Sequence, residues 1–190
     1  MAEQDYDKWL DSITIGGAQP LTKPIEIREY DPEWPRLYAR EEARIRSLLV
    51  GRVARIEHAG STSVPGLPAK PVIDIVLEVP DSADEDAYVP ALESGGYRLS
   101  IREPEWFEHR LFKGPDTNVN LHVFTAGCDE VDAMLRFRDH LRENDTDREL
   151  YAAAKRDLAA REWKYVQEYA DAKTDVVRAI MARATGSPRG

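Results

Sequence analysis

The feature that most constrains the fold is an almost wholly apolar run at residues 71–79, with the sequence PVIDIVLEV. A short run rich in Val, Ile and Leu is typical of a central strand that is covered on both faces. Because side chains alternate along a strand, Asp74, Val76 and Glu78 share one face. We therefore expect a sheet built around this strand, with Asp74 as its single interior acid and Glu78 at the strand end near solvent.

The rest of the pattern predicts further strands and helices around this run. Capping-box patterns at Ser82 with Glu85 and at Thr146 with Glu149 indicate two helix starts. The expected strands are 25–27, 53–58, 97–101, 107–112 and 119–124, and the expected helices are 32–49, 82–93 and two or three more after 129. This order predicts an α/β (α+β) fold, a mixed sheet flanked by helices, with a C-terminal helical portion.

The length of 190 residues fits one compact domain, which we place at residues 24–185. Residues 1–23 are expected to form a flexible or peripheral N-terminal extension, because they combine charges with Gly16, Gly17 and Pro20 and lack a sustained period. Residues 186–190 are expected to be a tail.

The net charge of −9 opposes binding to phosphate backbones, so general nucleic-acid binding is not expected. The single cysteine, Cys128, excludes an internal disulfide and favours a cytoplasmic location. No apolar run approaches the roughly 18 residues that a membrane span requires, so no membrane insertion is expected.

A glycine-serine pair, Gly60 and Ser61, directly follows the strand expected at 53–58. Glycine lets the backbone approach a phosphate closely, and the serine hydroxyl is a donor. The pair therefore indicates an anion-binding turn. The alternative is an ordinary tight turn stiffened by the prolines at positions 65, 68 and 71.

An acid inside an apolar strand loses its hydration, so Asp74 needs a cation, a hydrogen-bond donor or a metal as its partner. The alternative to a metal is a structural salt bridge to Lys70 or to an arginine.

Polar side chains alternate with apolar ones at Asn118, Asn120 and His122, so these three line one face of the sheet, either as a cleft or as an exposed surface. Candidates for neutralising a triphosphate are Lys70, Arg110, Lys113 and Lys173, each of which is otherwise a surface charge. Trp106 is the aromatic residue best placed to stack on a ligand.

Several segments together resemble the GrpB-like family. They are 29–35 (EYDPEWP), 58–67 (HAGSTSVPGL), 70–75 (KPVIDI), 120–124 (NLHVF), 137–142 (FRDHLR), 151–155 (YAAAK) and 169–173 (YADAK). The resemblance covers about residues 25–184. It implies a fold of the nucleotidyltransferase superfamily, in which acids bind divalent metals and a nucleotidyl group is transferred with release of pyrophosphate.

Residue by residue, the resemblance implies that Gly60 and Ser61 bind phosphate, together with Thr62, Ser63 and Lys70. It further implies that Asp74 binds Mg²⁺. On the later strand, where the superfamily pattern has an acid, the chain has Asn120 and His122, and we expect His122 to act as a ligand or a base. The expected ligand is then a nucleoside triphosphate, and the expected reaction is transfer to an unidentified acceptor.

The position of the second alternating acid is Val76, which departs from the superfamily pattern. This departure favours the alternative function, a non-catalytic module that binds a nucleotide or a protein partner. Some family members are fused to dephospho-coenzyme A kinase, so the partner class includes a kinase of that pathway. The acceptor, the base preference and the oligomeric state stay open.

Overall fold

A computed structural model describes residues 3–186 of the chain. Its core is one five-stranded sheet with the strand order β1-β2-β5-β4-β3. The strands are β1 (Arg55–Ala59), β2 (Ile73–Val79), β3 (Arg98–Glu103), β4 (His109–Lys113) and β5 (Val119–Thr125). Only β2 and β5 run parallel, and the other pairs are antiparallel. The predicted α/β fold, a mixed sheet flanked by helices, is confirmed.

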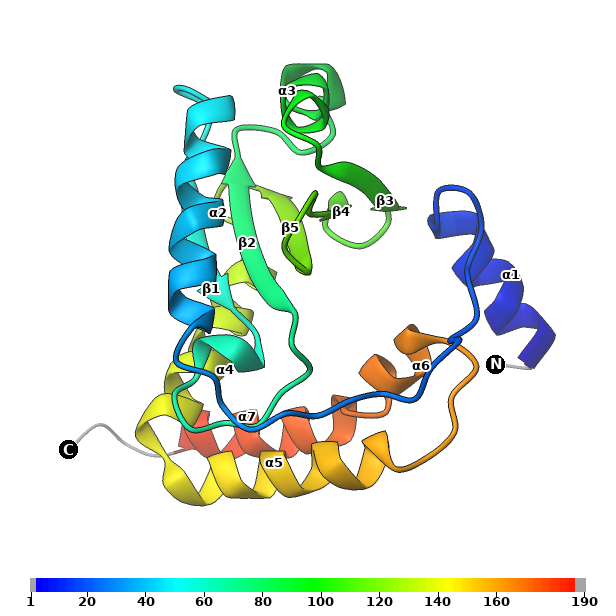
Figure 1. Cartoon of the computed structure of the whole chain (residues 1–190), viewed down its shortest axis with the longest axis vertical. Helices are drawn as coiled ribbons and strands as arrows, with labels where there is room; N and C mark the ends of the chain where they lie inside the picture. Colours follow the sequence, from blue (N-terminus) through cyan, green and yellow to red (C-terminus); the bar gives the residue numbers. More distant parts are fainter. Residues whose placement is uncertain (1–2, 187–190) are drawn as a thin grey trace.

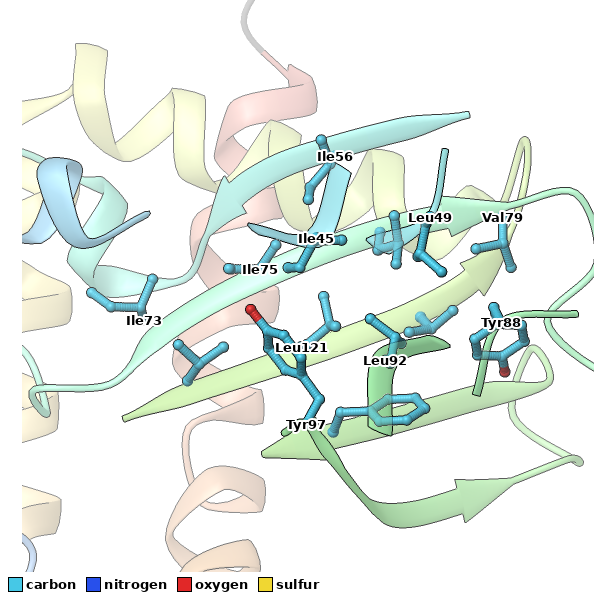
Figure 2. Packing of buried hydrophobic residues seen from close by; sticks show 14 of the residues in the cluster. Ile45, Leu49, Ile56, Ile73, Ile75, Val79, Tyr88, Leu92, Tyr97 and Leu121 are labelled. Atoms are coloured by element: carbon cyan, nitrogen blue, oxygen red, sulfur yellow. The ribbon is translucent and has the colours of Figure 1, made fainter. Parts of the chain in front are cut away.

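One face of the sheet is covered by α2 (Trp34–Leu48) and α3 (Val89–Ser94). Figure 1 shows α2 running alongside β1 and β2. Figure 2 shows the packing of this face, where Ile45 of α2, Leu49 directly after α2 and Leu92 of α3 meet side chains of the strands. Burial of these apolar side chains, at about 25 cal/mol per Å², stabilises the central strand from this side.

The opposite face is covered only in part. Val76 of β2 packs in an apolar cluster with Phe124 and with Val131 and Leu135 of α4 (Asp129–Glu143). A third cluster joins α5 (Asp145–Ala159) and α7 (Thr174–Gly186) to the chain around Val64. Beyond α4 a cavity lies against this sheet face, and α6 (Val166–Asp171) lies across from the sheet (Figure 1).

The N-terminal stretch contains a helix, α1 (Glu3–Ile13), at the edge of the molecule (Figure 1). The Ile15 amide donates to Ser100 of β3, and the Tyr6 hydroxyl donates to Asp171 of α6. Leu10 is buried. Helix α1 therefore contacts both the sheet edge and α6. Of the expected tail, residues 187–190 lie outside the described residues.

Four local predictions are wrong. Residues 25–27 form no strand, because the only pairing there is an isolated bridge from Arg28 to Ala69. Ser82 does not cap a helix: it bonds to Thr125, and a short 3-10 helix, η2 (Glu85–Ala87), precedes α3. Helix α5 is capped by the side chain of Asn144 instead of Thr146.

The fourth concerns Glu78, which is buried. Its carboxylate accepts hydrogen bonds from the amides of Gly127 and Cys128 and so holds the start of α4.

No helix within residues 3–186 is both long enough and apolar enough to cross a bilayer.

Candidate functional site

A cavity of about 1090 Å³ opens between the uncovered face of the sheet and helices α5 and α6, with α1 along one side. Sites for small molecules typically measure about 300–1,000 Å³. Side chains from β2, β4 and β5 form one wall, so the polar stripe at Asn118, Asn120 and His122 faces this cavity. The volume is sufficient for a ligand of nucleotide size.

One row of hydrogen-bonded side chains crosses the sheet below the cavity. Asp74 of β2 pairs in register with Asn120 of β5, which pairs with Lys113 of β4. The Lys113 ammonium donates to Asn120 Oδ1 at 2.6 Å, and Asn120 Nδ2 donates to Asp74 Oδ1 at 2.9 Å. The Asp74 side chain remains 27% exposed. Asp74 therefore lies on the cavity floor and is reached by solvent.

The turn after β1 rests directly on this carboxylate. Gly60 has a φ of +65°, and a Cβ at this position would lie 2.3 Å from Asp74 Oδ2. Both the left-handed backbone and the close approach require glycine. The 3-10 helix η1 (Ser61–Ser63) follows at once, so Gly60 and Ser61 line the cavity beside Asp74.

The same turn is braced from inside the protein. The Thr62 hydroxyl donates to the carbonyl of Val72 and lies 3.0 Å from Nε2 of His58. The Ser63 hydroxyl donates to the Gly60 carbonyl at 2.5 Å. Arg142 of α4 donates twice to the Ser63 carbonyl, at 2.8 and 3.1 Å. The side chains of Thr62 and Ser63 therefore hold the turn in shape.

The pKa of Asp74 is lowered. Burial opposes ionisation of this carboxyl, but the nearby His122 imidazole, the hydrogen bond from Asn120 and the charge of Lys173 outweigh it. Asp74 is thus an anion at neutral pH.

Four lysines converge on the cavity from four different segments. Lys70 precedes β2, Lys113 ends β4, Lys155 lies on α5 and Lys173 precedes α7. We call Lys70, Lys113, Lys155 and Lys173 the lysine cluster. It contains four of the chain's seven lysines. Among the ion pairs of residues 3–186, none joins a member of the cluster to a carboxylate.

The pKa of each lysine in the cluster is lowered, first of all by burial. Lys173 lowers the pKa of Lys70 further, while the charge of Asp74 opposes the shift in all four. Lys155 is the extreme case: it is 2% exposed, it donates to the carbonyl of Pro68, and its pKa falls to about 7. The cluster is a concentration of positive charge that the single nearby carboxylate, Asp74, does not balance.

A second chain of hydrogen bonds runs from β3 through β4 to His122, beside Asp74. Oε2 of Glu103 lies 2.7 Å from Nδ1 of His109, and Nε2 of His109 lies 3.1 Å from Nδ1 of His122. Nε2 of His122 lies 3.7 Å from Oδ1 of Asp74. We call Glu103, His109 and His122 the histidine relay.

The relay fixes the tautomers of its two imidazoles. Burial lowers the pKa of His109 to about 4, with the hydrogen bond to Glu103 opposing the shift, so His109 is neutral at pH 7. An ionised Glu103 only accepts, so the proton of His109 lies on Nδ1 and Nε2 accepts. His122 must then donate from Nδ1, which leaves its Nε2 toward Asp74 and the cavity.

Aromatic side chains mark the β3–β4 end of the cavity. Trp106 is 40% exposed and packs edge-on against His109 and Phe124. The two residues after it, Phe107 and Glu108, both have positive φ. Two consecutive non-glycine residues with positive φ are strained. Because they interrupt the extended backbone, β4 begins only at His109, and Trp106, before the turn, lines the cavity.

A second cavity, of about 680 Å³, lies beside Ser63 and three arginines, Arg138, Arg142 and Arg148. Its arginines already have anionic partners. Arg138 bonds to Glu57 and Asp139, and Arg148 bonds to Asp145. Its charge is balanced within the protein, in contrast to the lysine cluster.

The structure brings most of the expected site residues together. Gly60, Ser61, Thr62, Lys70, Asp74 and His122 all line the larger cavity, whereas Ser63 lines the smaller one. The hydroxyls of Thr62 and Ser63 donate to the carbonyls of Val72 and Gly60, and their expected role in phosphate binding stays a prediction. Arg110 is buried against Glu85 and Glu108, away from the cavity. Asp74 forms no salt bridge with Lys70.

Sequence reasoning missed Lys155, His109 and Glu103. Lys155 follows Tyr151 and Ala152 at helical spacing on the buried face of α5, so a lysine within an apolar stripe was a signal. The contact of His109 with His122 depends on the β4–β5 register, which no local pattern gives.

Comparisons with known proteins agree with this architecture. The chain is 58% identical over 181 residues to a UPF0157 protein of Halalkalibacterium halodurans, covering 95% of this chain and 93% of that one. It is 44% identical over 175 residues to a UPF0157 protein of Streptomyces coelicolor, covering 92% and 91%. A dephospho-CoA kinase of Mycolicibacterium paratuberculosis is 28% identical over 187 residues, covering 85% of this chain but 46% of the kinase.

Among solved structures, the crystal structure of the conserved protein GrpB from Enterococcus faecalis superposes with a TM-score of 0.73 at 29% identity. The match covers 84% of this chain and 96% of that one. The sequence model of the GrpB protein family matches residues 24–183. The chain therefore belongs to the GrpB family.

Proposed function

We propose that the larger cavity binds a nucleoside triphosphate. The observation that carries this proposal is the lysine cluster, which places four ammonium groups without carboxylate partners in one cavity of a chain with a net charge of −9. Buried charges are normally paired, so an excess of four lysines over the one carboxylate Asp74 favours an anion from outside the protein. A chain of phosphates supplies several negative charges within a short distance.

The two ends of the cavity suit the two ends of such a ligand. The phosphates lie against Gly60, Ser61 and the lysine cluster, and the base stacks on Trp106 at the other end. The proposal is consistent with the nucleotidyltransferase-type fold that the family resemblance implies. It is also consistent with the expected cytoplasmic location, because nucleoside triphosphates are made and used inside cells.

Isothermal titration calorimetry with ATP, GTP, CTP and UTP tests the proposal. We expect at least one of them to bind with a dissociation constant of about 1–100 μM, and the matching monophosphate to bind about tenfold more weakly or worse. In Lys70→Gln the affinity for the triphosphate falls, whereas Lys164→Gln, outside the cavity, leaves it unchanged. The absence of binding by all four triphosphates would refute the proposal.

The histidine relay favours a second candidate function, nucleotidyl transfer to a hydroxyl acceptor. Nε2 of His122 is the site that takes the proton of the acceptor hydroxyl, and the acceptor oxygen then bonds to the α-phosphorus. The bond from the α-phosphorus to the bridging oxygen breaks, and pyrophosphate leaves with that electron pair. The lysine cluster stabilises the charge that develops on the phosphates.

Transfer is tested with α-labelled triphosphates and a cell extract as the source of acceptor. We expect labelled product and pyrophosphate from the native protein. We expect His122→Gln to lose transfer by about 10²-fold or more while it keeps nucleotide affinity. Binding without labelled product favours the alternative, a non-catalytic module. In that case the relatives named dephospho-CoA kinase make such a kinase the first partner to test.

The expected Mg²⁺ ion does not fit the donor set of this cavity. The site of the second acid is Val76, which is buried against Phe124 and α4. No group of three or more His, Cys, Asp or Glu within residues 3–186 is arranged to hold a metal. Asp74 is the single carboxylate of its row, and its oxygens already meet Asn120, His122 and the Gly60 turn. In triphosphate sites the octahedral shell of Mg²⁺ takes water and phosphate oxygens together with one or two protein carboxylates whose oxygens are available to it, and the engaged carboxylate of Asp74 does not meet this need.

A further inference from the structure

We propose that the cavity takes its polyphosphate ligand free of any metal, and that the lysine cluster fills the place that divalent cations have in other triphosphate sites. The inference deepens the proposed function and rests on it. It names the form in which the ligand binds, and the residues that compensate its charge are Lys70, Lys113, Lys155 and Lys173.

The first support is where the lysines come from. They belong to four different segments, yet all four line the same cavity as Asp74, whose charge raises the pKa of each of them. The ammonium groups of Lys70 and Lys173 also face the ring of Tyr169, at 6.0 and 4.8 Å from its centre. Four positive groups therefore surround one negative group on the cavity floor.

The second support is the charge that a divalent cation would meet. An ion bound at Asp74 would lie among these four ammonium groups, and like charges repel most strongly where water is partly excluded. Three other carboxylates line the cavity wall. Glu103 is bonded to His109, Asp171 is bonded to Tyr6 and Gln167, and Glu105 is exposed beside Trp106, so four lysines still face Asp74 together with one solvated acid. A free polyphosphate matches this charge better than its magnesium complex, which carries two fewer negative charges.

The third support is the role left to Asp74. With Oδ1 bonded to Asn120 and Oδ2 against the Gly60 turn, its carboxylate orders the floor of the cavity and favours the charged form of the lysines around it. Asp74 is thus a positioning residue whose own charge opposes an incoming anion. If Asp74 instead bound a metal ion, that ion would attract the polyphosphate, and the charge of Asp74 would raise the polyphosphate affinity.

The test is calorimetric titration of the full chain with inorganic tripolyphosphate and with ATP, each in excess EDTA and in excess Mg²⁺. We expect tripolyphosphate to bind about tenfold more tightly in EDTA than in Mg²⁺. Lys173→Gln weakens binding in EDTA about tenfold, and the matched control Lys164→Gln, which replaces a lysine paired with Asp7 outside the cavity, does not.

Asp74→Asn distinguishes most sharply between a metal-free site and a site in which Asp74 binds Mg²⁺, because it keeps the shape of the side chain and removes its charge. We expect affinity for tripolyphosphate in EDTA to rise or stay level in this variant. A fall in affinity together with tighter binding in Mg²⁺ overturns the inference.

The titrations with ATP distinguish failure of the metal-free site from failure of the proposed nucleotide binding. ATP that binds only with Mg²⁺ refutes the metal-free site and keeps the nucleotide. Tripolyphosphate that binds in EDTA while no nucleotide binds keeps the metal-free site and refutes the nucleotide. Absence of binding by either ligand in either condition refutes both.

Discussion

Replacement of Gly60 by alanine is expected to lower the free energy of unfolding by about 2–4 kcal/mol and to abolish polyphosphate binding. The alanine Cβ would lie 2.3 Å from Oδ2 and 2.9 Å from Cβ of Asp74, so either the turn or β2 must move. The backbone φ of +65° adds strain to this collision. Because the turn and Asp74 together form the cavity floor, any relaxation displaces the phosphate site.

Gly66→Ala is the matched control, on the same connection between β1 and β2. Gly66 also has a positive φ, +76°, but an added Cβ meets nothing within 4 Å. We expect it to cost about 1 kcal/mol through the backbone alone and to leave binding unchanged. Chemical denaturation of both variants measures the difference. Equal losses in the two variants would mean that Gly60 does not rest on Asp74.

Lys155→Met is expected to change how stability depends on pH. The pKa of Lys155 falls to about 7 in the folded protein, first through burial and then through Lys173, against an ordinary value of 10.5. The folded state therefore disfavours the charged form. The destabilisation is complete below about pH 7 and fades as pH rises toward the pKa of the unfolded chain, because only there are both states neutral.

The stability of the native protein relative to Lys155→Met should therefore rise by about 3 kcal/mol from about pH 7 to about pH 9.5. Loss of the hydrogen bond to the Pro68 carbonyl shifts the variant by about 1–2 kcal/mol at every pH and leaves the slope unaffected. Urea unfolding at several pH values measures the slope.

Lys164→Met is the control for this series. The hydrogen bond to Asp7 raises the pKa of Lys164, so it stays charged throughout this range and its replacement gives a constant difference. A constant difference for Lys155→Met as well would contradict its desolvation. Lys155 therefore destabilises the fold at neutral pH and lines the cavity. This combination is expected of a lysine whose function is to bind an anionic ligand.

The central strand could be predicted because burial on both faces leaves its mark in the local sequence. The run at 71–79 is β2, and the polar stripe at 118–122 faces the cavity as its alternation indicates. Ser82 was misread because its partner, Thr125, lies 43 residues away. Capping patterns describe only local competition for backbone groups, and a distant hydroxyl overrides them.

The site could be predicted only where it lies on one segment. Gly60, Ser61, Lys70 and Asp74 are close in sequence, and their shared cavity follows from a turn between neighbouring strands. Lys155 lies on α5 and Lys173 directly precedes α7, and the docking of these two helices is set by apolar contacts around Val64 and Tyr151. The histidine relay depends on the register between β4 and β5. Because of the strained turn at Phe107 and Glu108, β4 starts at His109, two residues later than predicted.

The most direct measurement is a crystal structure of the protein with a bound nucleoside triphosphate, grown in EDTA. The account predicts density for the phosphates within hydrogen-bond distance of the Gly60–Ser61 turn and of the ammonium groups of the lysine cluster, with the base against Trp106. Phosphates bound instead in the smaller cavity beside Arg138 and Arg142, or held at Asp74 through a metal ion that persists in EDTA, would contradict it.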